Sequence, residues 1–197
     1  MLHGIAIMGL NGCGKSTLAH AIGKKLKFYE MDVEDYYFPE QKYSRIATLE
    51  HQQDVNCEYK GELPYSVPRS KLEVQQMIRD DIDRHPQFII SGVTMNWEED
   101  ILSAIDIVFI LEASTDERIN RVQQREELRF GSRVMPGGDM YEQQKRFRDI
   151  IADKSSLSVE ESADRIQCPK VKLDGTKSIE ENVCVVLNVL EKMEIWD

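Results

Sequence analysis

Cysteine is scarce and long hydrophobic runs are absent in this chain of 197 residues, and basic residues are fewer than acidic ones. The four cysteines show no CxxC spacing and no neighbouring histidine cluster, which argues against a structural zinc site or a disulfide framework. No hydrophobic run approaches the ~20 residues that a membrane-spanning helix needs. The first residues also lack a basic segment followed by an apolar one, so we expect no signal peptide and a cytoplasmic location.

The excess of acidic over basic residues limits the kinds of partner that we expect this protein to bind. The chain has 25 Lys and Arg residues against 35 Asp and Glu residues, which gives a net charge of −10. We expect no nucleic-acid partner, because the phosphate backbone repels an acidic surface. Hydrophobic residues at 41% and charged residues at 30% are ordinary for a globular protein, so we expect one domain over residues 1–197 with a sizeable core.

Short apolar runs alternate with helical patterns along the whole chain. Five strands are predicted, at residues 4–9, 28–31, 88–92, 107–111 and 170–173, and those at 4–9 and 88–92 are expected to be buried. Helices are predicted at residues 15–26, 70–84, 114–129, 139–153, 158–167 and from 178 onward, with a short helix opening at a capping box at Asn96. Residues 32–66 and 130–138 are expected to be irregular. This alternation predicts a three-layer α/β/α fold around a five-stranded parallel sheet in the order 2-3-1-4-5.

A glycine-rich motif joins the first predicted strand to the first predicted helix. It matches GxxxxGK[ST] at every fixed position, the P-loop of nucleotide-binding proteins, and reads Gly9-Leu10-Asn11-Gly12-Cys13-Gly14-Lys15-Ser16. Glycine lets backbone N–H groups turn toward a phosphate, and the helix N-terminus adds partial positive charge. We expect ATP to contact Gly9, Asn11, Gly12, Cys13, Gly14, Lys15, Ser16 and Thr17. Lys15 would bridge the β- and γ-phosphates, and the Ser16 hydroxyl would bind Mg²⁺.

Positive charge is concentrated in one segment of this acidic chain. Residues 118–148 contain eight Lys and Arg residues against four Asp and Glu residues. Three arginines share one face of a predicted helix: Arg121, Arg125 and Arg129. Arg133 follows in the glycine-rich loop, so residues 125–140 are expected to form a short basic lid that clamps a polyphosphate and excludes water. The alternative is a solvated helix with pairs such as Glu117–Arg121.

Two further segments resemble adenylate kinases and related nucleoside and nucleotide kinases. Residues 107–125 resemble the strand, helix and lid entrance of that family, and residues 171–183 resemble its last strand, adenine-contacting loop and final helix. The resemblance implies ATP, Mg²⁺ and a lid. It also implies that Arg121 lies near the ATP base and that Arg125 and Arg133 contact phosphates. Gly175 and Thr176 would line the adenine pocket.

The third predicted strand departs from the adenylate kinase pattern. That family continues from this strand with an aspartate and then Gly-Phe-Pro-Arg, where this chain has Ile90-Ser91-Gly92-Val93-Thr94. Ser91 stands in place of the carboxylate near magnesium, and the arginine that grips a nucleoside monophosphate is missing. This favours a nucleoside-like hydroxyl as the phosphoryl acceptor, whereas the overall resemblance favours a nucleoside monophosphate. Arg45 is a candidate replacement for the missing arginine.

Several carboxylates follow the second predicted strand. Residues 31–39 resemble the Asp-Asp-Phe/Tyr segment of uridine and nicotinamide riboside kinases, where an aspartate accepts a hydrogen bond from the attacking hydroxyl or helps to order Mg²⁺. A carboxylate suits this role because it is anionic at pH 7. Asp35 is the first candidate for the acceptor hydroxyl and Asp32 is the metal candidate, within an acceptor-binding region at residues 32–68. The alternative for either aspartate is a helix N-cap or a solvated turn.

Together these patterns predict an ATP-dependent phosphotransferase that acts on a small molecule. Its expected catalytic residues are Lys15, Asp35, Arg125 and Arg133, and its expected metal-binding residues are Ser16 and Asp32. The P-loop alone does not separate a kinase from an ATPase, so a regulatory ATPase that acts through a protein partner stays open, as does an inactive kinase fold. The sequence does not decide between a monomer and a homodimer.

Overall fold

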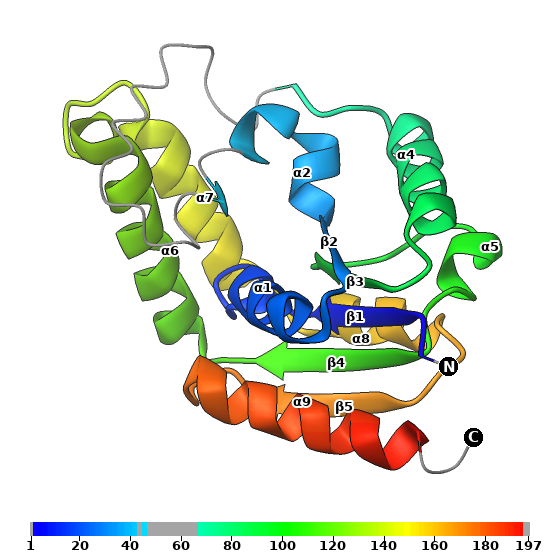
Figure 1. Cartoon of the computed structure of the whole chain (residues 1–197). Coiled ribbons are helices and arrows are strands. Elements are labelled where there is room, and N and C mark those ends of the chain that lie inside the picture. Colours follow the sequence, from blue (N-terminus) through cyan, green and yellow to red (C-terminus); the bar gives the residue numbers. More distant parts are fainter. Residues whose placement is uncertain (1, 43–44, 47–66, 195–197) are drawn as a thin grey trace.

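The computed structural model describes residues 2–42, 45–46 and 67–194, and its centre is a parallel β-sheet (Figure 1). The five strands of this sheet are β1 (Gly4–Met8), β2 (Tyr29–Asp32), β3 (Phe88–Gly92), β4 (Ile107–Glu112) and β5 (Lys170–Asp174). Their order is β2-β3-β1-β4-β5 and every neighbouring pair is parallel, which confirms the predicted topology. The order reverses around β1, and in such sheets ligands bind beyond the carboxyl ends of the strands at the point of reversal.

The strands have the burial that their sequences predict. Every residue of β1 and β3 is buried, because helices cover both faces of the sheet at its centre. The edge strand β5 has one buried residue, Leu173, and exposes its lysines to solvent. In register, Ala6 of β1 lies between Ile90 of β3 and Val108 of β4, so the core runs across the sheet.

Helices pack against both faces of the sheet and extend beyond its edge. Figure 1 shows α1 (Lys15–Leu26) and α9 (Ile179–Glu194) in front of the strands and α8 (Leu157–Asp164) behind them. The helices α6 (Thr115–Phe130) and α7 (Tyr141–Asp153) run side by side and project beyond the sheet, with α2 (Val33–Tyr37) on the opposite side. The remaining elements are η1 (Pro39–Gln41), α4 (Lys71–Arg84), α5 (Glu99–Leu102) and η2 (Gly131–Val134).

The helix starts predicted at residues 15, 70, 114 and 178 are present, and the prediction at Asn96 is wrong. Ser70 and Glu73 form a capping box at α4, and the Ser114 hydroxyl accepts a hydrogen bond from the Glu117 amide at 3.3 Å at the start of α6. The predicted capping box at Asn96 does not form, because α5 starts three residues later with Glu98 as its N-cap. Arg165 holds the preceding segment extended by donating to the Trp97 carbonyl at 2.8 Å.

Two segments that were expected to be irregular contain helical turns. The segment at residues 32–66 includes α2 and η1, and the Asp32 carboxylate caps α2 by accepting from the Glu34 amide at 3.0 Å. Most of the rest of that segment lies outside the described residues. The segment at residues 130–138 includes η2, which Phe130, Val134 and Met140 stabilise through a small apolar cluster of their own.

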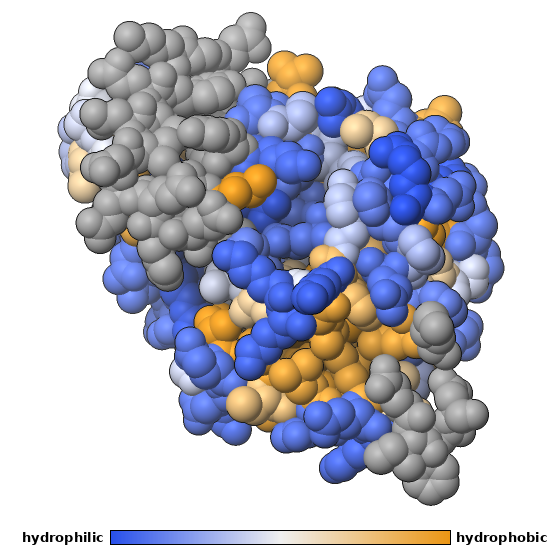
Figure 2. All heavy atoms as spheres, in the orientation of Figure 1, coloured by the Kyte–Doolittle hydropathy of each residue, from blue (hydrophilic) through white to orange (hydrophobic). Residues whose placement is uncertain are grey.

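The visible surface is mostly hydrophilic, with one extended hydrophobic area and a few separate hydrophobic side chains (Figure 2). Figure 2 shows that hydrophobic side chains gather over the region between α1 and α9 and that hydrophilic ones surround it. Of the helices in the described part of the chain, none has the length and hydrophobicity needed to cross a membrane.

Candidate active site

Two adjoining cavities lie beyond the carboxyl ends of the strands. The P-loop cavity has a volume of about 330 Å³, and the second, which we call the α7 cavity, has a volume of about 700 Å³. The P-loop cavity is lined by Asn11, Gly12, Gly14, Lys15, Ser16, Thr17, Glu34, Arg45, Arg121, Gln124, Arg125, Leu128 and Arg129. The α7 cavity is lined by Asn11, Glu34, Phe38, Val93, Arg125, Asp139, Glu142, Gln143, Gln144, Arg146, Phe147, Ile150 and Lys154. Asn11, Glu34 and Arg125 belong to both, so the two cavities meet at these residues.

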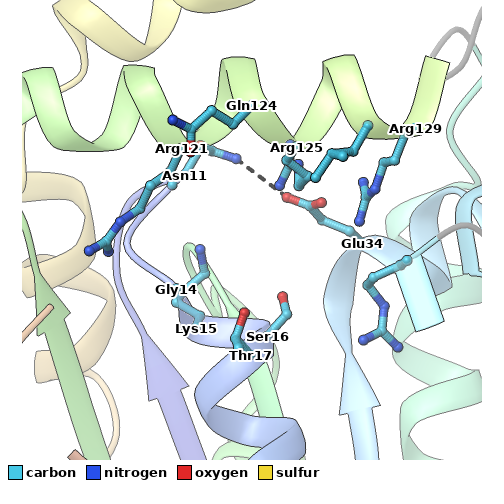
Figure 3. A pocket seen from close by; sticks show the side chains of 13 residues that line it. Asn11, Gly14, Lys15, Ser16, Thr17, Glu34, Arg121, Gln124, Arg125 and Arg129 are labelled. Carbon is cyan, nitrogen blue, oxygen red and sulfur yellow. Dashed lines mark hydrogen bonds between the residues drawn. The ribbon is translucent and has the colours of Figure 1, made fainter. Parts of the chain in front are cut away.

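The P-loop has the conformation that its glycines predict. Gly12 has a φ of +85°, and a Cβ at this position would collide with the backbone of Arg118 on α6. Glycine therefore allows α6 to approach the loop closely. Gly9 and Cys13 line neither cavity, and the Cys13 side chain is buried. Asn11 donates a hydrogen bond to Glu34 at 3.3 Å, which connects the loop to α2 (Figure 3).

Lys15 lies at the floor of the P-loop cavity. Its side chain is buried, and its Nζ donates to the Leu10 carbonyl at 3.1 Å. Burial lowers the pKa of Lys15, and the negative charge of Glu34 partly opposes this effect. Lys15 is thus a buried cation at the start of α1 with one hydrogen bond among the described residues. An anion such as a phosphate would give it further hydrogen-bond partners on entering the cavity.

The residues around Ser16 are chemically suited to Mg²⁺. The Ser16 hydroxyl and the Glu34 carboxylate both line the P-loop cavity, and Mg²⁺ prefers oxygen ligands together with water and substrate phosphates. Asp32 is buried beside β3, where its carboxylate accepts from the Ser91 hydroxyl at 2.9 Å, and it lines neither cavity. No group of three metal-binding side chains occurs among the described residues, so a nucleotide would have to supply much of the coordination.

The arginines of α6 face the P-loop, as their spacing predicts. Figure 3 shows Arg125 and Arg129 extending from α6 toward Glu34, on the side of the cavity opposite the start of α1. Both also pair with the buried Glu126, at 2.6 Å from Arg125 and 3.9 Å from Arg129. The expected Glu117–Arg121 pair is present at 2.8 Å, yet Arg121 still borders the P-loop cavity.

Arg121 connects the P-loop to the segment expected to hold adenine. It donates to the Gly175 carbonyl at 2.8 Å and to the Cys13 carbonyl at 3.4 Å. A Cβ on Gly175 would lie 2.8 Å from the Glu112 carbonyl oxygen, so glycine permits this close approach. Thr176 is exposed, and its hydroxyl donates to Asp174 at 2.6 Å. The structure thus brings Arg121 and Gly175 together beside the P-loop, although Gly175 and Thr176 do not line the cavity.

Arg133 does not face either cavity in this structure. Its guanidinium makes two hydrogen bonds to Asp139, at 3.0 and 2.7 Å, and these hydrogen bonds lower the pKa of Asp139. Arg133 is therefore held within the turn that joins η2 to α7. Of the expected lid arginines, Arg125 contributes to the cavities and Arg133 does not.

Asp35 is paired with Arg45 rather than placed in a cavity. Arg45 donates to both Asp35 oxygens, at distances from 2.5 to 3.1 Å, and to Glu30 at 3.1 Å. Its Nε also lies 3.9 Å from Asp32. Burial opposes the charge on Arg45, but the hydrogen bond to Asp35 and the three nearby carboxylates raise the pKa of Arg45 above its ordinary value. Arg45 therefore compensates the charge of an acidic cluster and lines only the P-loop cavity.

Glu34 and the residues of α7 line the cavities although the sequence patterns did not indicate them. Glu34 lies between the two aspartates that were singled out, and it is the carboxylate of that segment that lines both cavities. On α7, Phe147, Ile150 and Lys154 line the cavity at a spacing of i, i+3, i+7, which places them on one face of the helix. That spacing is visible in the sequence and could have indicated a shared surface.

Comparison with known proteins places this arrangement in a family. A protein-family model described as "AAA domain" matches residues 5–133, which is more than half of the chain. The chain belongs to this AAA domain family. The AAA domain match runs from β1 through the P-loop to the middle of η2, so it includes the arginines of α6. It ends before α7, which supplies most of the wall of the α7 cavity.

Several known proteins are similar to this chain along nearly its full length. The uncharacterized protein YqaC of Bacillus subtilis (strain 168) is 28% identical over 198 residues, which cover 96% of this chain and 98% of YqaC. Among solved structures, a sugar kinase of Janibacter sp. HTCC2649 is 15% identical with a TM-score of 0.49 and covers 97% of this chain and 95% of its own. The shikimate kinase of Aquifex aeolicus is 14% identical with a TM-score of 0.49 and covers 98% of both chains. These two structural likenesses carry no conclusion about activity.

Proposed function

We propose that this protein is a phosphotransferase that moves the γ-phosphoryl group of Mg·ATP to a small molecule bound in the α7 cavity. The observation that supports the proposal is the junction of the two cavities at Asn11, Glu34 and Arg125. A nucleotide in the P-loop cavity would place its last phosphate toward that junction. A second cavity of about 700 Å³ on the other side has the size expected for a small-molecule site.

The proposed catalysis relies on positioning and on charge neutralisation. Lys15 and the backbone N–H groups at the start of α1 would hold the β- and γ-phosphates. Arg125 and Arg129 would neutralise charge on the transferring group from the α6 side. Ser16 would hold Mg²⁺, which offsets the negative charge of the phosphates when it is bound. Glu34 would accept a hydrogen bond from the acceptor and orient it for attack.

This assignment gives Glu34 the role that the sequence suggested for Asp35. Asp35 is engaged by Arg45 on both carboxylate oxygens, so it has little capacity left for an acceptor. Asp32 is proposed to contribute negative charge behind the metal site, in place of the carboxylate that Ser91 cannot provide. Arg133 could join the phosphates only by leaving Asp139, so it takes no part in the proposed ground state.

The adenine base is proposed to lie beside Arg121, near the loop that contains Gly175 and Thr176. Arg121 already spans from that loop to the P-loop, so its planar guanidinium can stack on a base. The acceptor is proposed to be a nucleoside-like compound or a nucleoside monophosphate. Phe38 and Phe147 on the wall of the α7 cavity offer apolar surface to a ring system of this kind.

The test is ADP release from Mg·ATP in the presence of candidate acceptors. Purified protein would be assayed against nucleosides, nucleoside monophosphates, sugars and sugar acids, with Lys15→Met as the blank. We expect ADP release that depends on one class of acceptor and disappears in the variant. Tight ATP binding with slow ADP release that no acceptor stimulates would refute the proposal. It would favour a regulatory ATPase that acts through a protein partner.

A further inference from the structure

The α7 cavity has two ends. We call the end near the P-loop the reacting end and the opposite one the distal end. Both Nη atoms of Arg118 donate to the Ile151 carbonyl at 3.4 Å, and the backbone of Arg118 packs against Gly12 of the P-loop. The C-terminal end of α7 is therefore the end nearest to the P-loop. Lys154, three residues after Ile151, lies at this end with Glu34 and Asn11. The distal end is formed by the first two turns of α7.

Lys154 is a cation with no hydrogen-bond or ion-pair partner in the described part of the chain. Among the described residues it makes no hydrogen bond and no ion pair, and it is half-buried at the C-cap of α7. Burial lowers the pKa of Lys154, the charge of Glu34 opposes this effect and the charge of Arg118 reinforces it. Holding an ammonium group in this setting costs free energy, which a bound anion would offset.

The other charged groups of the cavity are differently engaged. Asp139 is held by Arg133, and Arg125 is paired with Glu126. Glu34 accepts a hydrogen bond from Asn11 and faces the positive charge of Lys15 as well as that of Lys154. Glu142 and Arg146 lie on the first two turns of α7, at the distal end. Of the cations that the described residues place at the reacting end, Lys154 is thus the one that no carboxylate pairs with.

Hydrophobic side chains lie between the two ends. Phe147 and Ile150 come from α7, and Phe38 and Val93 face them from the end of α2 and the segment after β3. A ring can pack against two aromatic side chains while one polar end of the ligand reaches the junction of the cavities. This arrangement suits a molecule with an apolar or ring-shaped body and one charged end.

From this placement we infer that the acceptor is an anion and that Lys154 binds its anionic group next to the junction of the two cavities. The inference rests on the proposed function and names the chemical class of its acceptor, a ring-bearing phosphomonoester or carboxylate. Lys154 takes the acceptor-binding role that the sequence suggested for Arg45, because Arg45 is held by Asp35 and Glu30 and lines only the P-loop cavity.

The test measures binding, so it does not depend on phosphoryl transfer. Matched neutral and anionic probes would be titrated calorimetrically into protein saturated with Mg²⁺ and a non-hydrolysable ATP analogue. The pairs are adenosine, cytidine, thymidine and uridine with their 5′-monophosphates, and glucose with glucuronate. Lys154→Met removes the charge, Lys154→Arg keeps it, and Lys145→Met removes an exposed lysine of α7 that lines neither cavity.

We expect the unmodified protein to prefer one anionic probe over its neutral partner. Lys154→Met should reduce affinity for that anion by about 10- to 100-fold and leave the neutral partner unchanged. Lys154→Arg should retain much of the preference and Lys145→Met all of it. A preferred monophosphate identifies a phosphomonoester, and preferred glucuronate identifies a carboxylate.

Four outcomes would overturn the inference. They are equal binding of neutral and anionic probes, no binding of any anionic probe, an unchanged preference in Lys154→Met, and a loss of ATP-analogue affinity in Lys154→Met. The last would place Lys154 on the nucleotide instead of on the acceptor. Anion binding that depends on Lys154 without any ADP release would refute the proposed function and leave the anion site standing.

Discussion

The substitution Arg45→Met is expected to destabilise the protein strongly. Arg45 is 7% exposed and Asp35 is 8% exposed, and the guanidinium also contacts Glu30 at 3.1 Å. Without Arg45, the buried carboxylate of Asp35 and the nearby Asp32 lose their compensating cation. Removing one partner of a buried ion pair costs about 3–5 kcal/mol. For a chain of this size, that loss lowers Tm by roughly 6–20 °C.

Substituting the partner should cost less, because the remaining charge keeps other contacts. In Asp35→Asn, Arg45 still faces Glu30 and Asp32, so a loss of about 1–3 kcal/mol is expected. The double variant should lose less than the sum of the two single losses, by about 1 kcal/mol or more. Arg84→Met is the matched control, since Arg84 is exposed and pairs only with Asp81 of its own helix among the described residues, and its effect should stay within about 0.5 kcal/mol.

Urea unfolding followed by circular dichroism provides the measurement, repeated at pH 5 and pH 8. Burial already raises the pKa of Asp35, and loss of Arg45 removes the hydrogen bonds and charge that oppose this rise. A carboxylate with a raised folded-state pKa takes up a proton as pH falls, so the deficit of Arg45→Met should be smaller at pH 5 than at pH 8. Two results would refute the assignment of this pair as structural. One is a double variant whose loss in free energy of unfolding equals the sum of the two single losses, and the other is an Arg45→Met loss no larger than that of Arg84→Met.

Four shorter predictions concern the site itself. Lys15→Met should abolish ATP binding yet leave Tm of the free protein equal or higher, because it removes a buried charge; a calorimetric ATP titration and a melting curve check this. Saturating ATP at one hundred times Kd should stabilise the unmodified protein by about 2.7 kcal/mol, and no such rise should occur in the variant. Glu34→Gln should lower kcat by roughly 100-fold or more with ATP affinity retained, whereas equal activity would remove Glu34 from the proposed mechanism. Gly12→Ala should cost about 1–3 kcal/mol in urea unfolding, since it combines a positive φ with a backbone collision, and a neutral effect would contradict the close packing of α6 on the P-loop. Arg133→Met should change kcat/KM less than Arg125→Met does, and the reverse order would show that Arg133 leaves Asp139 during turnover.

Much of the fold could be predicted because its signals are local. Apolar runs of four to six residues indicate buried strands wherever they occur, and alternation with helices restricts the topology to parallel crossovers. The P-loop is contiguous, so its glycines and Lys15 act together whatever the rest of the chain does. The α6 arginines share a face because the period of the helix fixes it, and Ser114 caps that helix as its sequence indicates.

The error at Asn96 arose because a distant segment competes for the same part of the chain. Asn96 has the sequence of a helix cap, but Arg165, far along the chain, holds the segment extended through the Trp97 carbonyl. Arg133 has the position of a lid arginine, and in this structure its Nε and Nη2 both donate hydrogen bonds to Asp139. Such pairings depend on which partner is nearer after folding, and spacing in the sequence does not encode that distance.

The sequence by itself determined the sheet, the nucleotide-binding loop and the face of α6 that turns toward it, because each follows from residues within a few positions of one another. Only the tertiary structure decided which carboxylate reaches the junction of the cavities. Glu34 and Asp35 are neighbours on α2, and successive residues of a helix point about 100° apart. The packing of α2 against the P-loop and the insertion of Arg45 turn Glu34 toward the cavities and Asp35 away from them. The α7 cavity likewise exists only because α7 folds back along α6 and faces α2.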